Sequence, residues 1–241
     1  MIVAAHQPHY LPWLRYMAKV ALADVFVLLD DVQYTRRGWQ NRNRIKTADG
    51  WTYLTVPVHT HADSRILDVK VAEERWRTQH WKSLRTAYGR SPHFSPHAGF
   101  FESFYANPWE RLVDLNVASL DYLRSALGIR TPFVRASSLG VPGRASERLV
   151  RICKELGATL YLSGAYAATN HLDRSAFRGS GVEIAVLQWE CPTYTQCHPK
   201  AGFVPDLSVV DLLFNEGPRA LTVLLGGARI LQDASVEGSR E

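Results

Sequence analysis

The chain has 241 residues, of which 46% are hydrophobic and 21% charged, and its formal net charge is +5. This length suits one large domain, or a main domain with a small appendage, and leaves enough apolar side chains for a sizeable core. The mild basic excess fits a small anionic molecule or RNA, but no nucleic-acid-binding motif accompanies it. We therefore favour a small-molecule partner over nucleic acid, and keep tRNA or a carrier protein open as a donor.

Three cysteines at positions 153, 191 and 197 are too few and too irregularly spaced for a disulfide framework or a zinc site, and their odd number argues against a secreted protein. No apolar run reaches the ~18 residues that span a membrane. The N-terminus lacks the basic region and long apolar stretch of a signal peptide. We expect a cytoplasmic protein that makes no membrane contact.

The first thirty residues predict a strand, a helix and a second strand. Residues 2–5 form a short buried-strand pattern, and residues 14–23 space their apolar side chains as a helix does. Residues 24–30, DVFVLLD, form an apolar run between aspartates, which is typical of a strand buried on both faces of a parallel sheet. Together they predict a right-handed βαβ unit.

The alternation of strands and helices continues to the end of the chain. The pattern predicts strands at 51–59, 66–71, 158–164 and 182–189, and helices at 74–90, 109–127, 147–157 and 209–217. Ser146 and Ser208 are the expected N-caps of the last two helices, and the stretch 31–50 looks too hydrophilic for a core element. The fold class is therefore α/β, a Rossmann-like mostly parallel sheet flanked by helices, with a small helical subdomain. We expect three parts: 1–72 and 131–241 forming the α/β domain, and 73–130 as a helical insertion.

Ligands of open α/β sheets bind outside the carboxyl ends of the strands, and three polar segments follow strands here, at 6–10, 30–46 and 163–173. In the first, a histidine after a strand is well placed for acid–base catalysis or phosphate binding, and Pro8 and Pro12 restrict the backbone around it. We predict His6 as a catalytic residue and Gln7 and Tyr10 as substrate-binding residues. His9 is expected to be exposed.

The segment 30–46 is the densest in polar side chains. Asp30 and Asp31 are predicted to orient His6 or to bind a substrate amine, and the guanidinium groups suit phosphate or carboxylate. The alternative is a surface loop in which acids and bases pair with one another. The predicted substrate-binding residues of this loop are Gln33, Arg37, Gln40, Asn41, Arg42, Arg44 and Lys46.

The later segments add four candidates. Ser163 and Gly164 end a strand, where small residues allow close approach of a ligand, and they are predicted to bind substrate. His171 is predicted to be catalytic and His198 to bind substrate. The chain has no GxxxxGK[ST], GxGxxG or GxSxG motif, so no P-loop, dinucleotide site or hydrolase elbow is expected. We predict no metal site, and the sequence identifies no cofactor.

Several blocks of the chain resemble one protein family. HQPHYLPW (6–13), DDVQ and NRNRIK (30–46), YLSGAYAATNHLD (161–173) and PDLSVVDLLFNEGP (205–218) closely resemble the WbqC-like family. The resemblance implies a protein of cell-surface polysaccharide or natural-product biosynthesis, with transfer of a sugar or acyl group as the expected activity. Arg15 replaces a common glycine of that family and His9 a common asparagine.

A more distant likeness links the opening of the chain to HxGH nucleotidylyltransferases and pantothenate synthetase, in which a histidine turn binds nucleotide phosphates. This chain has HQPH instead, without the glycine that would let a phosphate approach the helix start. The likeness supports the Rossmann-like sheet more than it supports adenylyl transfer.

Three functions remain open from the sequence. The first is a transferase that moves an acyl or aminoacyl group from a phosphate- or carboxylate-bearing donor onto an amine of a sugar or related precursor, with His6 as general base. The second is a nucleotidylyltransferase or ligase of the HxGH type. The third is a non-enzymatic module that binds RNA or a protein through the basic loop, which leaves the histidines and aspartates at the strand ends unexplained.

Overall fold

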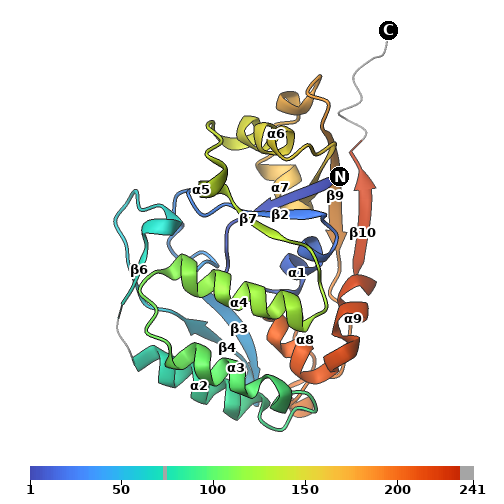
Figure 1. Cartoon of the computed structure of the whole chain (residues 1–241). Coiled ribbons are helices and arrows are strands. Elements are labelled where there is room, and N and C mark those ends of the chain that lie inside the picture. The colour runs from blue at the N-terminus through green and yellow to red at the C-terminus, as the bar shows by residue number, and fades with distance from the viewer. Residues whose placement is uncertain (73–74, 234–241) are drawn as a thin grey trace.

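The computed structural model describes residues 1–72 and 75–233, and it is built around a six-stranded sheet in the order β10-β9-β8-β1-β2-β7 (Figure 1). The neighbours among β1 (Ile2–His6), β2 (Val25–Leu28), β7 (Phe133–Arg135), β8 (Leu160–Gly164) and β9 (Glu183–Trp189) run parallel. The edge strand β10 (Ala228–Gln232) is antiparallel to β9. The predicted α/β class with a mostly parallel sheet is confirmed.

The direction in which the chain crosses the sheet reverses at its centre. From β1 the chain adds β2 and then β7 on one side, and it later returns to place β8, β9 and β10 on the other. The reversal lies between β1 and β8. In open α/β sheets such a switch point opens a crevice at the carboxyl ends of the strands.

The sheet is covered on both faces because its central strands are apolar throughout. Val3 and Ala5 of β1 pack with Ile152 and Cys153 of α6 (Ala145–Glu155). Ala4 points the other way, into the larger core. That core is completed by α1 (Leu14–Ala21), α4 (Leu112–Ala126), α8 (Val209–Glu216) and α9 (Ala220–Gly226).

A second group of elements lies below and to the left of the sheet in Figure 1. It contains the hairpin of β3 (Arg42–Thr47) and β4 (Gly50–Thr55), the short pair β5 (Val58–His59) and β6 (Lys70–Val71), and the helices α2 (Arg75–Tyr88) and α3 (Ser95–Ala106). The short helices α5 (Ala136–Leu139) and α7 (Ala165–Asn170) lie above. Single 3-10 turns occur at Ile66–Asp68, Arg174–Phe177, Pro199–Ala201 and Gly217–Arg219.

Most predicted elements are present, with five corrections. The single strand expected at 51–59 is two short strands, β4 and β5, which belong to different sheets. The hydrophilic stretch was expected to hold no core element, but it contains β3, in which Ile45 and Lys46 are buried. The expected strand at 66–71 is a 3-10 turn followed by the two residues of β6. Ser146 is not an N-cap: α6 begins at Ala145 with Arg144 as its N-cap, and the Ser146 hydroxyl accepts a hydrogen bond from the amide of Asp173. The sequence patterns did not predict the helices α3, α5, α7 and α9 or the strands β7 and β10.

The other sequence expectations concern boundaries. Residue 74, the expected start of one helix, lies outside the described residues, which show α2 from Arg75. The expected cap of α8 is present, since the Ser208 hydroxyl accepts from the amide of Val210. The division into 1–72, 73–130 and 131–241 stays a prediction, and its boundary at 73 and its last eight residues lie outside the described residues.

Candidate functional site

A cavity of about 940 Å³ lies at the carboxyl ends of four parallel strands. Its lining includes His6 at the end of β1, Leu29 just after β2, Ser163 and Gly164 at the end of β8, and Trp189 at the end of β9. The remaining walls come from α1, the loop that follows β2, α6 and α7. The cavity therefore occupies the switch point of the sheet, and its volume suits a small molecule.

The structure brings six of the predicted site residues to this cavity and leaves ten elsewhere. The predicted residues that line it are His6, Gln7, Gln40, Ser163, Gly164 and His171. Those that lie outside its lining are Tyr10, Asp30, Asp31, Gln33, Arg37, Asn41, Arg42, Arg44, Lys46 and His198.

His6 lines the cavity with a fixed tautomer. Its Nδ1 lies 3.2 Å from the carbonyl oxygen of Gln7, and since a carbonyl only accepts, Nδ1 carries the proton and Nε2 keeps the lone pair. Burial, with a smaller contribution from the nearby Lys19, lowers the pKa of His6 well below its ordinary value. The imidazole is therefore neutral near pH 7 and can accept a proton at Nε2.

The turn that carries His6 is held by side chains from distant elements. The carbonyl of Gln7 accepts from the Tyr16 hydroxyl at 3.1 Å, that of Pro8 from Asn116 Nδ2 at 3.1 Å, and that of Leu11 from Asn43 Nδ2 at 2.6 Å. Leu11 has φ 40°, a left-handed conformation that a branched side chain adopts only under constraint. The turn is thus rigid because the surrounding fold supplies its hydrogen-bond partners.

His9 is buried, which corrects the expectation that it is exposed. It retains 3% of its accessible surface, and its ring lies 4.6 Å from the centroid of His6 and 5.1 Å from that of Trp13. Burial, and next the nearby Lys19, lower the pKa of His9 to about 3. His9 is therefore a neutral member of the cavity wall.

Lys19 was not selected from the sequence, yet it lines the cavity from α1. Its ammonium donates to the carbonyl of Ala5 at 3.0 Å, and burial lowers its pKa to about 7. The signal that could have identified it is a lysine among the apolar residues of the helix predicted at 14–23.

Asp30 does not orient His6, and that prediction is corrected. Its fully buried carboxylate accepts from Arg135 Nε at 2.7 Å and from the amide and hydroxyl of Ser137 at 2.9 and 2.7 Å. Burial alone would raise the pKa of Asp30, but these hydrogen bonds outweigh it and hold the pKa below its ordinary value. Asp30 therefore joins β2 to β7 and α5.

Asp31 also pairs with an arginine rather than with His6. Its two carboxylate oxygens accept from Arg148 Nη1 and Nη2 at 2.8 and 2.5 Å. Arg148 lines the cavity, so Asp31 acts on the site only by fixing a side chain of its wall.

Tyr10, predicted to bind substrate, is instead a fully buried core residue. Its hydroxyl bonds to His80 Nδ1 at 2.9 Å and to the Tyr105 hydroxyl at 2.5 Å. This arrangement connects the N-terminal turn to α2 and α3, and it leaves the hydroxyl no contact with the cavity.

The basic loop does not form one anion-binding cluster. The Arg42 and Arg44 guanidinium groups lie over the rings of Tyr53 and Trp51, at 4.8 and 5.1 Å from their centroids. The fully buried Lys46 ammonium donates to the carbonyl of Gly202. These cations therefore support the β3–β4 hairpin rather than the cavity.

The loop's uncharged candidates divide in the same way. Gln40 Nε2 donates to Gln7 Oε1 at 2.6 Å inside the cavity. Asn41 and Gln33 donate to the carbonyls of Val56 and Ala62 at 2.8 and 2.9 Å, outside it. The remaining charged candidate of the loop, Arg37, is exposed and adopts φ 61°.

The two later histidines are separated in space. His171 lies in the wall formed by α7, with its ring 5.5 Å from that of Tyr166. His198 lies at a different hollow, beside α2, where its Nε2 bonds to the carbonyl of Ala87 at 2.8 Å. The prediction that both serve one site is therefore wrong for His198.

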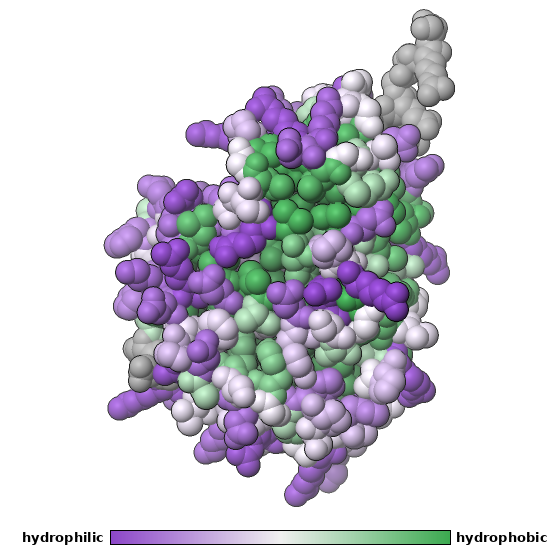
Figure 2. All heavy atoms as spheres, in the orientation of Figure 1, coloured by the Kyte–Doolittle hydropathy of each residue, from purple (hydrophilic) through white to green (hydrophobic). Residues whose placement is uncertain are grey.

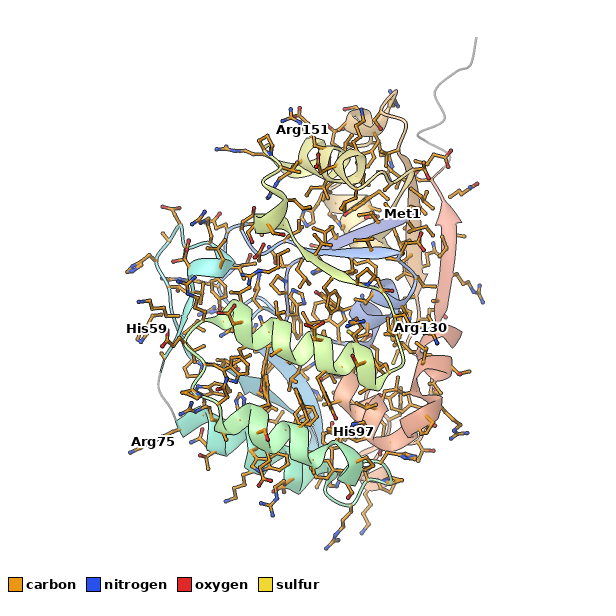
Figure 3. All side chains as sticks on the ribbon, viewed as in Figure 1. Met1, His59, Arg75, His97, Arg130 and Arg151 are labelled. Carbon is orange, nitrogen blue, oxygen red and sulfur yellow. The ribbon has the colours of Figure 1, made fainter. Side chains whose placement is uncertain are left out.

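Aromatic side chains form much of the remaining wall. Trp13, Trp39, Tyr166 and Trp189 line the cavity, and the rings of Trp13 and Trp39 meet edge to face with centroids 4.6 Å apart. Apolar surface is also visible in the upper half of the molecule, between hydrophilic side chains (Figure 2). Arg75, Arg130 and Arg151 lie far apart from one another in Figure 3.

Residues 1–72 and 75–233 contain neither a metal-binding cluster nor a membrane-spanning helix. No group of three or more His, Cys, Asp or Glu side chains in these ranges is arranged to hold a metal ion. Within the same ranges, no helix has both the length and the apolar character needed to cross a bilayer.

Strand order and cavity together define an α/β protein of Rossmann-like topology with a small-molecule cavity at its switch point. The profile of the WbqC-like protein family matches residues 7–223, and the chain belongs to this family. It is 33% identical over 222 residues to the uncharacterized protein Rv1507c of Mycobacterium tuberculosis (strain ATCC 25618 / H37Rv), a match that covers 90% of this chain and 95% of that protein. No solved structure matches the chain significantly.

Proposed function

We propose that this protein is a small-molecule transferase that moves an acyl or aminoacyl group onto an amine of a sugar or a related precursor. The observation that carries the proposal is His6, a neutral histidine of fixed tautomer in a switch-point cavity. A neutral imidazole with a free Nε2 has the state that a general base requires.

In the proposed step, the amine nitrogen attacks the carbonyl carbon of the donor. The new C–N bond forms as the bond between that carbon and the leaving group breaks. His6 Nε2 takes the proton released by the nitrogen and returns it to the leaving group, so that the imidazole ends the cycle neutral. Gln7 and Gln40, joined side chain to side chain, offer amide groups that would orient the acceptor.

The aromatic wall supports an acceptor with a ring. Trp13, Trp39 and Trp189 present apolar faces and edges beside the polar groups of the turn. Such faces suit the C–H surface of a sugar, whereas a few convergent polar groups would fix its orientation.

The test uses purified protein with acyl-coenzyme A thioesters and aminoacyl-tRNA as donors, and free and nucleotide-linked amino sugars as acceptors. Mass spectrometry should show the acyl mass added to the amine. His6→Gln should lower the rate about 100-fold or more, the contribution typical of a general base, with an unchanged melting temperature. His59→Gln is the matched control, since His59 lies at the periphery of the molecule (Figure 3). A stable His6→Gln variant with wild-type turnover would rule out the assigned role.

Nucleotidyl transfer is the second candidate, and one observation favours it. His6 and His9 come into contact just after the first strand of a Rossmann-like sheet, at the position where nucleotide phosphates bind in many such folds. ATP or CTP with Mg²⁺ should then raise the melting temperature. Absence of any shift at millimolar nucleotide would leave acyl transfer as the better account.

A further inference from the structure

The cavity contains a buried cation without an acidic partner. Lys19 retains 6% of its accessible surface, and its ammonium makes one hydrogen bond, to the carbonyl of Ala5. None of the described residues that line the cavity is Asp or Glu. A buried ammonium that lacks a counter-charge is costly to a folded protein, so its place in a cavity wall calls for an explanation.

The two arginines of the wall differ from Lys19 in this respect. Arg15 pairs with Asp206 at 2.9 Å, and Arg148 pairs with Asp31. Both carboxylates lie outside the cavity lining, so the charges of these two guanidinium groups are balanced by residues that do not face the cavity. Among the cations of the described wall, Lys19 is the one without a carboxylate partner, and its ammonium lies over the ring of Phe26, 5.7 Å from the ring centroid.

His9 provides a second unmet polar group beside it. Its Nδ1 is buried and has no hydrogen-bond partner among the described residues, although the ring lines the cavity and packs 5.2 Å from that of Tyr16. Buried side-chain nitrogens nearly always have a partner, so this nitrogen is a second polar group of the wall that the fold leaves unsatisfied. Lys19 and His9 lie close enough for the lysine charge to act on the histidine.

We propose that Lys19 and His9 form the subsite for the anionic oxygen group, a carboxylate or a phosphate, of the small molecule that enters this cavity. The proposal rests on the proposed function in taking this cavity as the substrate site. It also moves the expected anion contact from the basic loop, whose cations support the hairpin, to the first helix.

Without an anion, burial leaves the pKa of Lys19 at about 7 and that of His9 at about 3. A bound carboxylate or phosphate would favour the charged form of both, because opposite charges within a few ångströms raise the pKa of a base. Binding at pH 8 must therefore take up protons. Calorimetric titration in two buffers with different ionisation enthalpies measures that uptake directly.

The probes are inorganic phosphate and acetate, titrated separately into the wild-type chain at pH 8 and low ionic strength. Binding of either, with proton uptake, is expected. Phosphate alone indicates a phosphorylated ligand, acetate alone a carboxylated one, and both together an anion site that accepts either. Binding of neither anion would overturn the proposal.

Lys19→Met is the decisive variant, because methionine has a similar length and no charge to desolvate. Its affinity for the anion should fall at least tenfold. Lys154→Met, at an exposed position of α6, is the control and should bind as the wild type does. Equal binding by Lys19→Met and the wild type would overturn the assignment.

A measurement on the wild type keeps the proposal testable if the variant fails to fold. Nitrogen-15 NMR of the lysine ammonium groups should show the pKa of Lys19 rising when phosphate or acetate is added, and an unchanged pKa would refute the site. Neither measurement depends on turnover. Anion binding without acyl transfer would retain this subsite and reject the transferase, and transfer without anion binding would do the reverse.

Discussion

Arg148 holds Asp31 by two parallel hydrogen bonds of 2.8 and 2.5 Å, from its two terminal nitrogens to the two carboxylate oxygens. Arg148 belongs to α6 and Asp31 to the loop after β2, so the pair connects two walls of the cavity. Only 13% of the Arg148 side chain and 20% of the Asp31 side chain remain accessible, so water screens the pair less than it screens an exposed one.

Asp31→Asn should therefore destabilise the protein. One carboxylate oxygen is replaced by an amide nitrogen, which cannot accept a hydrogen bond, and the partly buried guanidinium of Arg148 loses its counter-charge. We expect a loss of about 1–3 kcal/mol in the free energy of unfolding, measured by urea denaturation. Asp68→Asn is the control, because the Arg65–Asp68 pair is about half exposed and should contribute less than ~1 kcal/mol. Equal losses in the two variants would contradict this account.

Tyr10→Phe should weaken the fold rather than ligand binding. The substitution removes the hydroxyl that bonds both His80 and Tyr105 and leaves two buried polar groups without that partner. The expected cost is about 1–3 kcal/mol in unfolding free energy. Tyr53→Phe, at an exposed position, should cost much less. Phosphate binding by Tyr10→Phe should equal that of the wild type, and a selective loss of binding with full stability would restore Tyr10 to the site.

Lys19 should make the stability of the protein depend on pH. Its pKa is about 7 in the fold, below the ~10.4 of an unfolded lysine, so the unfolded state holds an extra proton between these values and wild-type stability rises with pH in that range. Lys19→Met lacks this dependence. Its stability advantage over the wild type should be largest near pH 6 and should shrink by about 2–3 kcal/mol by pH 9. Urea titrations of both proteins at the two pH values measure the difference. A constant difference would show that Lys19 is not buried as described.

The sequence predicted where the cavity lies better than it predicted which side chains line it. Apolar runs at 2–5 and 24–30 were sufficient to predict the central strands, and the switch point then placed His6 and Gln7 beside Ser163 and Gly164. These assignments depend on local patterns and on one general rule of parallel sheets.

Local sequence patterns could not predict the partners of the side chains, because these partners are distant in sequence. Asp30 bonds residues more than a hundred positions later, and Lys46 bonds Gly202, so charge density alone could not show that these groups were already paired. The strand β3 was not predicted because its sequence is hydrophilic. Its polar side chains donate to backbone carbonyls of other segments, as Asn43 does to Leu11. Lys19 was missed because a lysine in a helix is usually solvated.

Asn116 gives the sharpest test of how the fold holds the turn that carries His6. It is fully buried in α4, and its Nδ2 donates to the carbonyl of Pro8 at 3.1 Å and to that of Gln40 at 2.7 Å, so one amide joins the turn to the loop that follows β2. Asn116→Ala leaves both carbonyls without this donor and should cost about 2–4 kcal/mol in unfolding free energy, against less than ~1 kcal/mol for the exposed Asn107→Ala. Because the turn carries His6 and His9, phosphate affinity should fall in Asn116→Ala even where the protein is fully folded. Wild-type affinity in the folded variant would mean that the hydrogen bonds from Tyr16 and Asn43 hold the turn without it.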